Sequence, residues 1–505
     1  MLAQTYTAVQ EGVEARLITV EASSLKTTPK IQITGLPGEV VKESRERIMA
    51  CLSHLGFDIP RHRILIHLLP AGFKKQGSQF DMAMALATLK ADGCLDGVNL
   101  ERFGFLGELS LDGRLRAVVG LLSLAETLAA TPGIETIFVP ADNSKEAALL
   151  RGSKIRIVSH LGEVLDHLRG VREVVYHKIE KTAQSASVPW DRTIDDVKGH
   201  AMAKRALQVA IAGGHHFLMI GSPGVGKSLL ASCTPSLLPR LLDEEIVEVA
   251  KIHSLSSTFF ATDQRPFRSP HHTVSSAGLL GGGSGYVTPG EVTLAHRGVL
   301  FLDELPEFRR DGIEGLREPL ETGSIDIHRV GSRFKFPARF TLIAAMNPCP
   351  CGLAMQSARS CGCPWERVEQ YRKRISGPIL DRIDLSVTMA ISYSEDPPKK
   401  PITHAEAIKG IQSAWNRQQE RYRKSSHKTN ATASLTPNLE PLIFSEKVLN
   451  LVDDYAKRYQ LSHRSRVKWL RTSLTVCDIE GAERVEEKHL YEAWGLKCIH
   501  LFQKL

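Results

Sequence analysis

The 505-residue chain has no run of about 18 uncharged apolar residues, so the sequence predicts neither a membrane span nor a membrane partner. The first 22 residues show no basic flank followed by an apolar run, which argues against a secretory signal. Cysteine is scarce, and nine residues scattered over this length do not form a disulfide framework. No internal repeat or transit peptide is visible. Together these absences predict a cytoplasmic protein whose cysteines stay reduced.

What the chain does contain is typical of folded domains. Hydrophobic residues make up 42% and charged residues 24% of the sequence, so sizeable cores can form. At about 100–200 residues per domain, the length predicts roughly three domains. The net charge of +8 permits a polyanionic partner without requiring one.

The order of local patterns predicts a multidomain α/β protein. In residues 1–175, β-branched runs that begin at Ile31, Ile64 and Ile137 alternate with helical patterns. This alternation predicts an α/β or α+β domain.

Three further segments follow the first domain. Residues 176–190 are small and polar and predict a linker. Residues 191–395 predict a second α/β domain, and residues 396–505 predict a basic linker followed by a small helical domain. The stretch 399–430 carries eight Lys or Arg against two Glu, and a solvated linker is favoured there over a DNA-binding segment.

A glycine-rich turn lies between the short apolar strand from Leu218 and a helical pattern from Leu229. Strand, turn and helix in this order are the context of a phosphate-binding loop, in which glycines let backbone N–H groups converge on phosphate. The lysine of the turn would reach the β- and γ-phosphates, and the serine after it would offer its hydroxyl to Mg²⁺. The predicted cofactors are therefore ATP and Mg²⁺, and the predicted binding residues are Gly221, Ser222, Pro223, Gly224, Val225, Gly226, Lys227 and Ser228.

Two acidic residues, Asp303 and Glu304, end a second apolar run that starts at Val299. A buried parallel strand delivers such carboxylates to its C-terminal edge, where ligands bind in open α/β sheets. We expect Asp303 to hold Mg²⁺ and Glu304 to polarise the attacking water. An acidic loop would be the alternative if no phosphate loop preceded the pair.

Three polar residues further along fit an ATPase of the AAA+ class. Asn347 ends another apolar strand and would position the lytic water. Arg382 would act as an arginine finger, which in this class serves the neighbouring subunit's site and therefore implies a ring. Arg464, at the start of a helical pattern, is similar to the arginine with which the lid senses the γ-phosphate. A surface salt bridge is the alternative for each arginine taken alone.

Longer motifs surround these residues. Phe-Arg-Ser-Pro-His-His-Thr occupies 267–273, Gly-Leu-Leu-Gly-Gly-Gly-Ser-Gly occupies 278–285, Pro-Gly-Glu-Val-Thr-Leu-Ala-His occupies 289–296, and Ala-Ala-Met-Asn-Pro-Cys-Pro-Cys-Gly occupies 344–352. With them the chain resembles, over essentially its whole length, the magnesium-chelatase-like AAA+ ATPases and their YifB/ComM branch. Arg297 departs from the family pattern, where we expect asparagine.

The resemblance implies a hexameric, ATP-driven DNA helicase that promotes branch migration while incoming single-stranded DNA is integrated during natural transformation. It implies single-stranded and branched DNA, further copies of the chain and recombination proteins as partners. A protein-remodelling ATPase is the alternative, and a nucleotide-regulated scaffold is a third hypothesis. Intact Asp303, Glu304 and Arg382 argue against the scaffold.

The first domain is similar to the Lon protease domain, a ribosomal-S5-domain-2-like fold, on the motifs that begin at Gly72 and Gly107. A Ser-Lys protease dyad would need an activated hydroxyl beside a base. The two corresponding positions hold Gln79 and Leu122, and Ser78 has no lysine in the matching turn. We therefore expect a scaffold without protease activity.

Four of the cysteines form two Cys-x-Cys pairs, Cys349 with Cys351 and Cys361 with Cys363. Four thiolates suit a tetrahedral Zn²⁺ ion, which would order a loop that has little core of its own. Four free thiols in a loop are the alternative.

Residues 324–336 alternate polar and apolar side chains on both sides of a Val-Gly-Ser turn, which predicts a hairpin. In helicases of the clade that the chain resembles, hairpins at this place line the central pore. Arg329, Arg333 and Lys335 would then contact DNA phosphates without base specificity. An ordinary solvated basic hairpin is the alternative.

Overall fold

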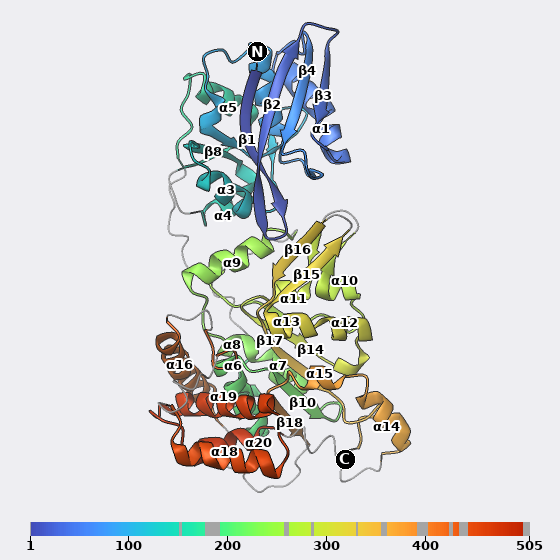
Figure 1. The fold of residues 1–505 in the computed structure, drawn as a ribbon, viewed down its shortest axis with the longest axis vertical. Helices are drawn as coiled ribbons and strands as arrows, with labels where there is room; N and C mark the ends of the chain where they lie inside the picture. Colours follow the sequence, from blue (N-terminus) through green and yellow to red (C-terminus); the bar gives the residue numbers. More distant parts are fainter. Residues whose placement is uncertain are drawn as a thin grey trace.

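A computed structural model gives the fold of the chain (Figure 1), and it describes residues 2–150, 154–176, 192–256, 262–283, 287–329, 332–354, 361–390, 402–423, 428–433 and 443–497. An N-terminal domain stands at one end of an elongated molecule, a central α/β domain follows, and C-terminal helices pack beside the central domain. Apart from Tyr176, the linker predicted at 176–190 lies outside the described residues. Among the described helices, none has the length and apolar character needed to cross a membrane.

The N-terminal domain contains a seven-stranded mixed sheet in the order β3-β4-β2-β1-β5-β8-β9. Helices α1 and α2 pack with one apolar cluster and α3 with another on the opposite side of the sheet. The predicted strands from Ile31, Ile64 and Ile137 are confirmed. The bounds are β1 Leu2–Glu11, β2 Glu14–Leu25, β3 Lys30–Thr34, α1 Glu39–His54, β4 Arg63–Leu69, α2 Asp81–Ala91, β5 Phe103–Phe105, β6 Glu108–Leu109, β7 Leu115–Arg116, α3 Leu121–Ala130, β8 Thr136–Pro140, α4 Ser144–Ala147, β9 Ile155–Val158 and α5 Leu161–Leu168.

The positions that correspond to a protease dyad are packed into this domain. Gln79 is 8% exposed and Leu122 is fully buried. The Ser78 hydroxyl donates to the carboxylate of Glu108, while the buried Lys75 ammonium donates to backbone carbonyl oxygens. The described contacts thus favour a scaffold over a protease.

The central domain is built on a parallel five-stranded sheet in the order β11-β14-β17-β10-β18. Successive apolar residues of β10 enter different clusters, Phe217 on one face and Leu218 on the other, because strand side chains alternate between faces. Helices cover both faces, as burial of a parallel sheet requires. The bounds are α6 Ala201–Gly213, β10 Phe217–Gly221, α7 Lys227–Ser232, α8 Thr234–Leu237, α9 Asp243–His253, β11 Phe267–Arg268, α10 Ser276–Leu280, β12 Gly281–Gly282, β13 Thr288–Pro289, α11 Glu291–Leu294, β14 Val299–Leu302, α12 Arg310–Gly315, α13 Arg317–Thr322, β15 Ser324–Arg329, β16 Ser332–Pro337, β17 Thr341–Met346, α14 Trp365–Arg372, α15 Gly377–Leu380 and β18 Leu385–Met389.

The C-terminal helices are α16 His404–Arg421, α18 Glu446–Arg458, α19 His463–Glu480 and α20 Glu487–Gly495. The solvated linker expected at 399–430 is wrong for residues 404–421, because α16 buries Ala407, Gly410, Ile411 and Ala414 against the central domain. These residues recur at helical spacing, but their small side chains make a weak hydrophobic pattern. Of the charged residues that suggested a linker, Lys409 is exposed, whereas Arg417 and Arg421 bond to Gly481 and Asp478 at the end of α19.

The N-terminal domain contacts the central domain through α9 and the turn between β1 and β2. The N–H of Gly120 donates to the Ser254 carbonyl at 3.0 Å, and Lys251 pairs with Glu126 at 2.5 Å. Val13, in the β1–β2 turn, joins the apolar cluster that lies beneath the β15–β16 hairpin.

Candidate nucleotide site

The glycine-rich turn after β10 folds around the Lys227 side chain. Gly224 and Gly226 have φ angles of 75° and 96°, left-handed conformations that glycine adopts without strain. The Lys227 ammonium donates to the carbonyls of Gly221 at 2.6 Å and Ser222 at 2.9 Å. Burial lowers the pKa of Lys227, and the two nearby carboxylates oppose that decrease. The turn therefore holds a positive charge at the C-terminal edge of the sheet.

Ser228 and Asp303 meet beside this turn. Oγ of Ser228 donates to Oδ2 of Asp303 at 2.5 Å, and Oδ1 of Asp303 accepts from the backbone N–H of Glu304 at 2.9 Å. A hydroxyl next to a carboxylate is the oxygen donor set with which proteins hold Mg²⁺ beside phosphates. The two side chains therefore fit the predicted ion.

Strand β17 carries Asn347 to the same edge. Because β10 and β17 are parallel neighbours with Ile220 opposite Met346, their C-terminal residues end side by side. Oδ1 of Asn347 accepts from the Lys227 ammonium at 3.1 Å. The structure thus brings together five of the sequence-predicted residues: Lys227, Ser228, Asp303, Glu304 and Asn347.

Glu304 stands in an unusual backbone conformation. Its φ is 52°, in the left-handed region that costs a non-glycine residue free energy and is enriched at functional sites. Its carboxylate lies 3.1 Å from Nδ1 of His272, whose ring contacts that of His271 with centroids 4.1 Å apart. A cleft of about 420 Å³ is lined by these residues together with Ser228.

His272 is a site residue that the sequence analysis placed only within a longer motif. It follows β11, which is the parallel neighbour of β14, and that neighbour relation was not readable from the chain. The predicted catalytic carboxylate of Glu304 is therefore paired with a histidine in this structure.

Arg382 and Arg464 lie at the opposite edge of the sheet. Both line a cleft of about 760 Å³ that also includes His216 and Gly298, which precede strands β10 and β14. The nucleotide residues follow those strands, and the five residues of β10 separate the two edges by roughly 15 Å. A single chain therefore keeps the two predicted arginines apart from its own Lys227.

The turn that carries Arg382 is fixed to α19 by an ion pair. The Lys468 ammonium lies 2.9 Å from Oδ1 of Asp384 and donates to the Asp381 carbonyl at 2.6 Å. Burial by itself would raise the pKa of Asp384, but Lys468 and His215 hold it well below its usual range. Arg464 lies on the first turn of α19. The contact of Lys468 with Asp381 and Asp384 therefore fixes the position of Arg382 relative to Arg464.

Arg297, where we expect asparagine from the family pattern, also lines the cleft that Arg382 and Arg464 line. Its φ is 62°, a conformation that asparagine tolerates better than arginine. Its guanidinium compensates by pairing with Glu248 at 2.8 Å and Glu245 at 3.5 Å. The substitution therefore adds a cation to the cleft and anchors it to α9.

His216 links the strands of the central sheet in a pH-dependent way. Its Nδ1 accepts from the backbone N–H of Leu342 at 3.0 Å, which only an unprotonated nitrogen can do. Burial lowers the pKa of His216 to about 4. The unfolded chain takes up this proton near pH 6.5 and the folded chain does not, so the stabilisation is present above about pH 6.5 and is lost as the pH falls toward 4.

When the pH is lowered from about 7 to about 5, we therefore expect the free energy of unfolding of the wild type to fall by about 2 kcal/mol more than that of His216→Asn. Asparagine keeps an acceptor oxygen but does not titrate. Urea denaturation at the two pH values measures the difference. Parallel losses in the two proteins would contradict the assignment.

Comparisons with known proteins extend over the whole chain. The family described as magnesium chelatase, subunit ChlI, matches residues 193–396; subunit ChlI of Mg-chelatase matches 20–143, and its C-terminal part matches 403–497. YifB of Salmonella typhimurium is 37% identical over 509 residues, covering 99% of this chain and 97% of the relative. Competence protein ComM of Haemophilus influenzae is 35% identical over 516 residues, covering 100% of this chain and 99% of the relative.

A more distant similarity is confined to part of the chain. Lon protease of Brevibacillus choshinensis is 31% identical over 163 residues, which cover 30% of this chain and 20% of that protease.

Proposed function

Because this chain belongs to the magnesium-chelatase-like ATPase family that includes YifB and ComM, we propose that it is an ATP-driven DNA motor that works as a hexameric ring. In this proposal it promotes branch migration while incoming DNA is integrated by homologous recombination. Its partners are single-stranded and branched DNA, further copies of the chain and other recombination proteins, and its place of action is the cytoplasm.

The proposed ring is supported by the distance between the nucleotide residues and the two arginines. Lys227, Asp303 and Glu304 follow the sheet strands, whereas Arg382 and Arg464 line a cleft at the other ends. A head-to-tail contact between two copies would place the arginine edge of one against the nucleotide edge of the next, and repetition of that contact closes a ring. Each complete site then contains residues of two subunits.

The nucleotide edge suits phosphoryl transfer to water. Lys227 would bind the β- and γ-phosphates, and Ser228 with Asp303 would hold Mg²⁺, which neutralises phosphate charge. Glu304 would accept a proton from the attacking water after leaving His272, and Asn347 would orient that water. From the neighbouring subunit, Arg382 would stabilise the charge on the transferred group, after exchanging its pairing with Glu321 for the phosphate.

The β15–β16 hairpin supports DNA as the substrate. In its register His328 stands opposite Arg333 and Asp326 opposite Lys335, so these polar side chains share one face. Arg333 and Lys335 are exposed, and Arg333 pairs with Asp326 at 2.5 Å. The backbone of Arg329 pairs with Ser332, but its side chain lies outside what the structure describes. Exposed cations in this position fit a phosphate backbone.

The alternative, a protein-remodelling ATPase, depends on aromatic residues of the same hairpin being free to grip a polypeptide. Phe336 is fully buried, and Phe334 packs against the apolar cluster that also contains Ile325. Their face is turned toward this apolar cluster, which favours the DNA motor.

The test is ATP turnover with and without forked DNA. We expect DNA to stimulate the wild type and the stimulation to be lost in Arg333→Ala/Lys335→Ala, with turnover in the absence of DNA unchanged. The slope of log affinity against log salt should fall by about 2. The control is Lys457→Ala/Arg458→Ala, which removes two exposed cations from α18. Stimulation by an unfolded protein and none by DNA would establish the alternative instead.

A further inference from the structure

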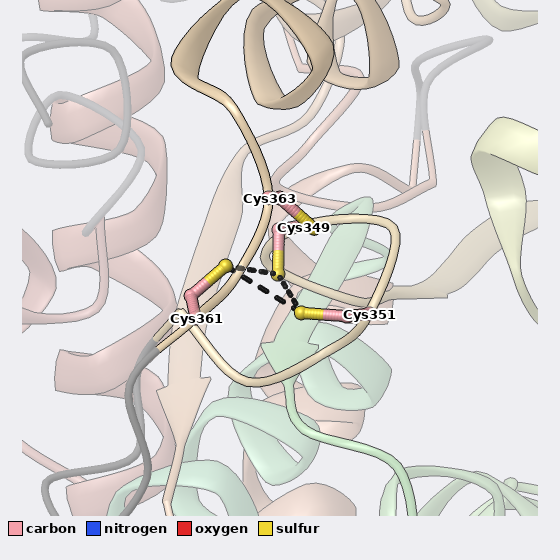
Figure 2. Close-up of side chains that lie close together, drawn as sticks. All are labelled: Cys349, Cys351, Cys361 and Cys363. Carbon is pink, nitrogen blue, oxygen red and sulfur yellow. Dashed lines mark hydrogen bonds between the residues drawn. The ribbon is translucent and has the colours of Figure 1, made fainter.

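The four cysteines of the two Cys-x-Cys pairs converge in space (Figure 2). Cys349 and Cys351 follow β17, and Cys361 and Cys363 precede α14. All four sulfur atoms lie within 4.8 Å of one another. Three of the separations, between Cys349, Cys351 and Cys361, are 3.4–3.5 Å. The side chains thus point at a common centre from two segments of chain.

These separations select one kind of ligand. Tetrahedral zinc with Zn–S bonds of about 2.3 Å places its sulfurs about 3.8 Å apart, close to the separations found. A disulfide requires sulfurs about 2.05 Å apart, so none of the three measured pairs is bonded. An iron–sulfur cluster needs cysteines spread around several iron and sulfide ions, which four sulfurs this close together do not enclose. The geometry fits one ion in a closed four-thiolate site.

The cysteine loop lies against the phosphate loop. Gly352 has a φ of 77°, and a Cβ placed on it would lie 2.3 Å from Cδ of Pro223. That distance is below any real contact, so the backbone at Gly352 packs directly on the glycine-rich turn. At the start of the cysteine loop, Cys349 is only two residues from Asn347. The loop therefore supports two parts of the nucleotide site at once.

A contact with α14 completes this arrangement. Nε of Arg372 donates to the carbonyl of Pro348 at 3.3 Å, which ties the helix after Cys363 to the residue between Asn347 and Cys349. Cys349 is fully buried while Cys351 is exposed. A segment with so few apolar side chains gains its order from a metal more readily than from a core of its own.

We propose that Cys349, Cys351, Cys361 and Cys363 bind one structural zinc ion, and that this ion fixes Asn347 and Pro223 in the positions that ATP turnover requires. The zinc site itself stands apart from the proposed function, whereas its effect on turnover rests on that function. Loss of the ion frees the loop, and a displacement of about 1 Å at catalytic groups can lower turnover about 100-fold.

The first experiment measures metal in the full-length protein by elemental analysis. We expect one zinc per chain in the wild type and less than a tenth of that in Cys351→Ser/Cys363→Ser. Cys94→Ser, which changes a half-buried cysteine outside the cluster, is the matched control and should keep its zinc. Wild type loaded with Co²⁺ should show the visible absorption of tetrahedral four-thiolate cobalt. This measurement uses the wild type alone, so it does not depend on whether the cysteine variants fold. Substoichiometric zinc, or iron in its place, would overturn the assignment.

The second experiment tests the coupling with the zinc ligands intact. Gly352→Ala keeps all four cysteines but drives a methyl group into Pro223, so we expect full zinc content together with ATP turnover lowered at least tenfold. Unchanged turnover in this variant would overturn the coupling and leave the zinc site standing. If wild type with full zinc turned over no ATP, the proposed function would fail while the metal assignment held.

Discussion

Glu304→Gln is expected to stop ATP turnover while leaving ATP binding intact. The amide keeps the size of the side chain but cannot accept a proton from the attacking water, and loss of such a base costs about 10²–10⁴-fold. Lys227 and the Ser228–Asp303 pair, which would hold the phosphates and the ion, are unchanged in the variant. Steady-state phosphate release measures turnover, and binding of a fluorescent ATP analogue measures affinity.

The same variant should assemble into ATP-bound rings that carry out no branch migration on a synthetic four-way junction. Lys227→Ala differs, because it should lose nucleotide binding as well as turnover. Glu307→Gln serves as the control: this carboxylate lies three residues further on and pairs with Arg374 at 2.8 Å. Equal branch migration by Glu304→Gln and the wild type would refute the mechanism.

Arg382→Ala is expected to lower turnover about 10³-fold or more, the range found for arginine fingers. The structural reason is that Arg382 lies at the opposite edge of the sheet from Lys227, so in the proposed ring its effect would be exerted on a neighbouring subunit. Arg464→Ala should act in the same direction, since Arg464 lines the same cleft and α19 is held to the Arg382 turn by Lys468.

A mixing experiment separates action on the neighbour from action within the chain. Neither Arg382→Ala nor Lys227→Ala should hydrolyse ATP alone, but in rings formed from equal amounts about a quarter of the interfaces combine an intact lysine with an intact arginine. Activity should therefore appear on mixing. Arg45→Ala, on α1 of the N-terminal domain, should be active with or without a partner. Mixtures as inactive as their components would show that the arginine does not work across an interface.

Some parts of the site were predictable because they are contiguous in the chain. Strand, glycine-rich turn and helix around Lys227 form one local unit, and so does the apolar run that ends in Asp303. The β15–β16 hairpin was predictable from the alternation of polar and apolar residues alone, since successive side chains of a strand lie on opposite faces. The cysteine pairs predicted a candidate metal site from spacing, although spacing did not show whether the two pairs would meet.

Other parts were missed for physical reasons. The sequence predicts a linker over helix α16 because the buried face of this helix consists mainly of small residues such as Gly410, which packs against Gln208. The sequence analysis did not predict the long β1–β2 hairpin at the N-terminus, although Ile18, Val20 and Ala22 of β2 alternate with polar residues and are buried. The contact between His272 and Glu304 depends on which strands are neighbours, and strand order is set by packing of the whole sheet rather than by any local pattern.

The sequence by itself determined which chemical groups this protein offers: a lysine, a hydroxyl and carboxylates at spacings that suit ATP and Mg²⁺, and the two arginines to which the proposed function assigns the charge on phosphate. Only the tertiary structure decided where each group stands, with Lys227 and Asp303 at one edge of a parallel sheet and Arg382 at the other. The physical reason is that every strand of such a sheet runs in the same direction. Residues that follow strands and residues that precede them are therefore held a full strand length apart.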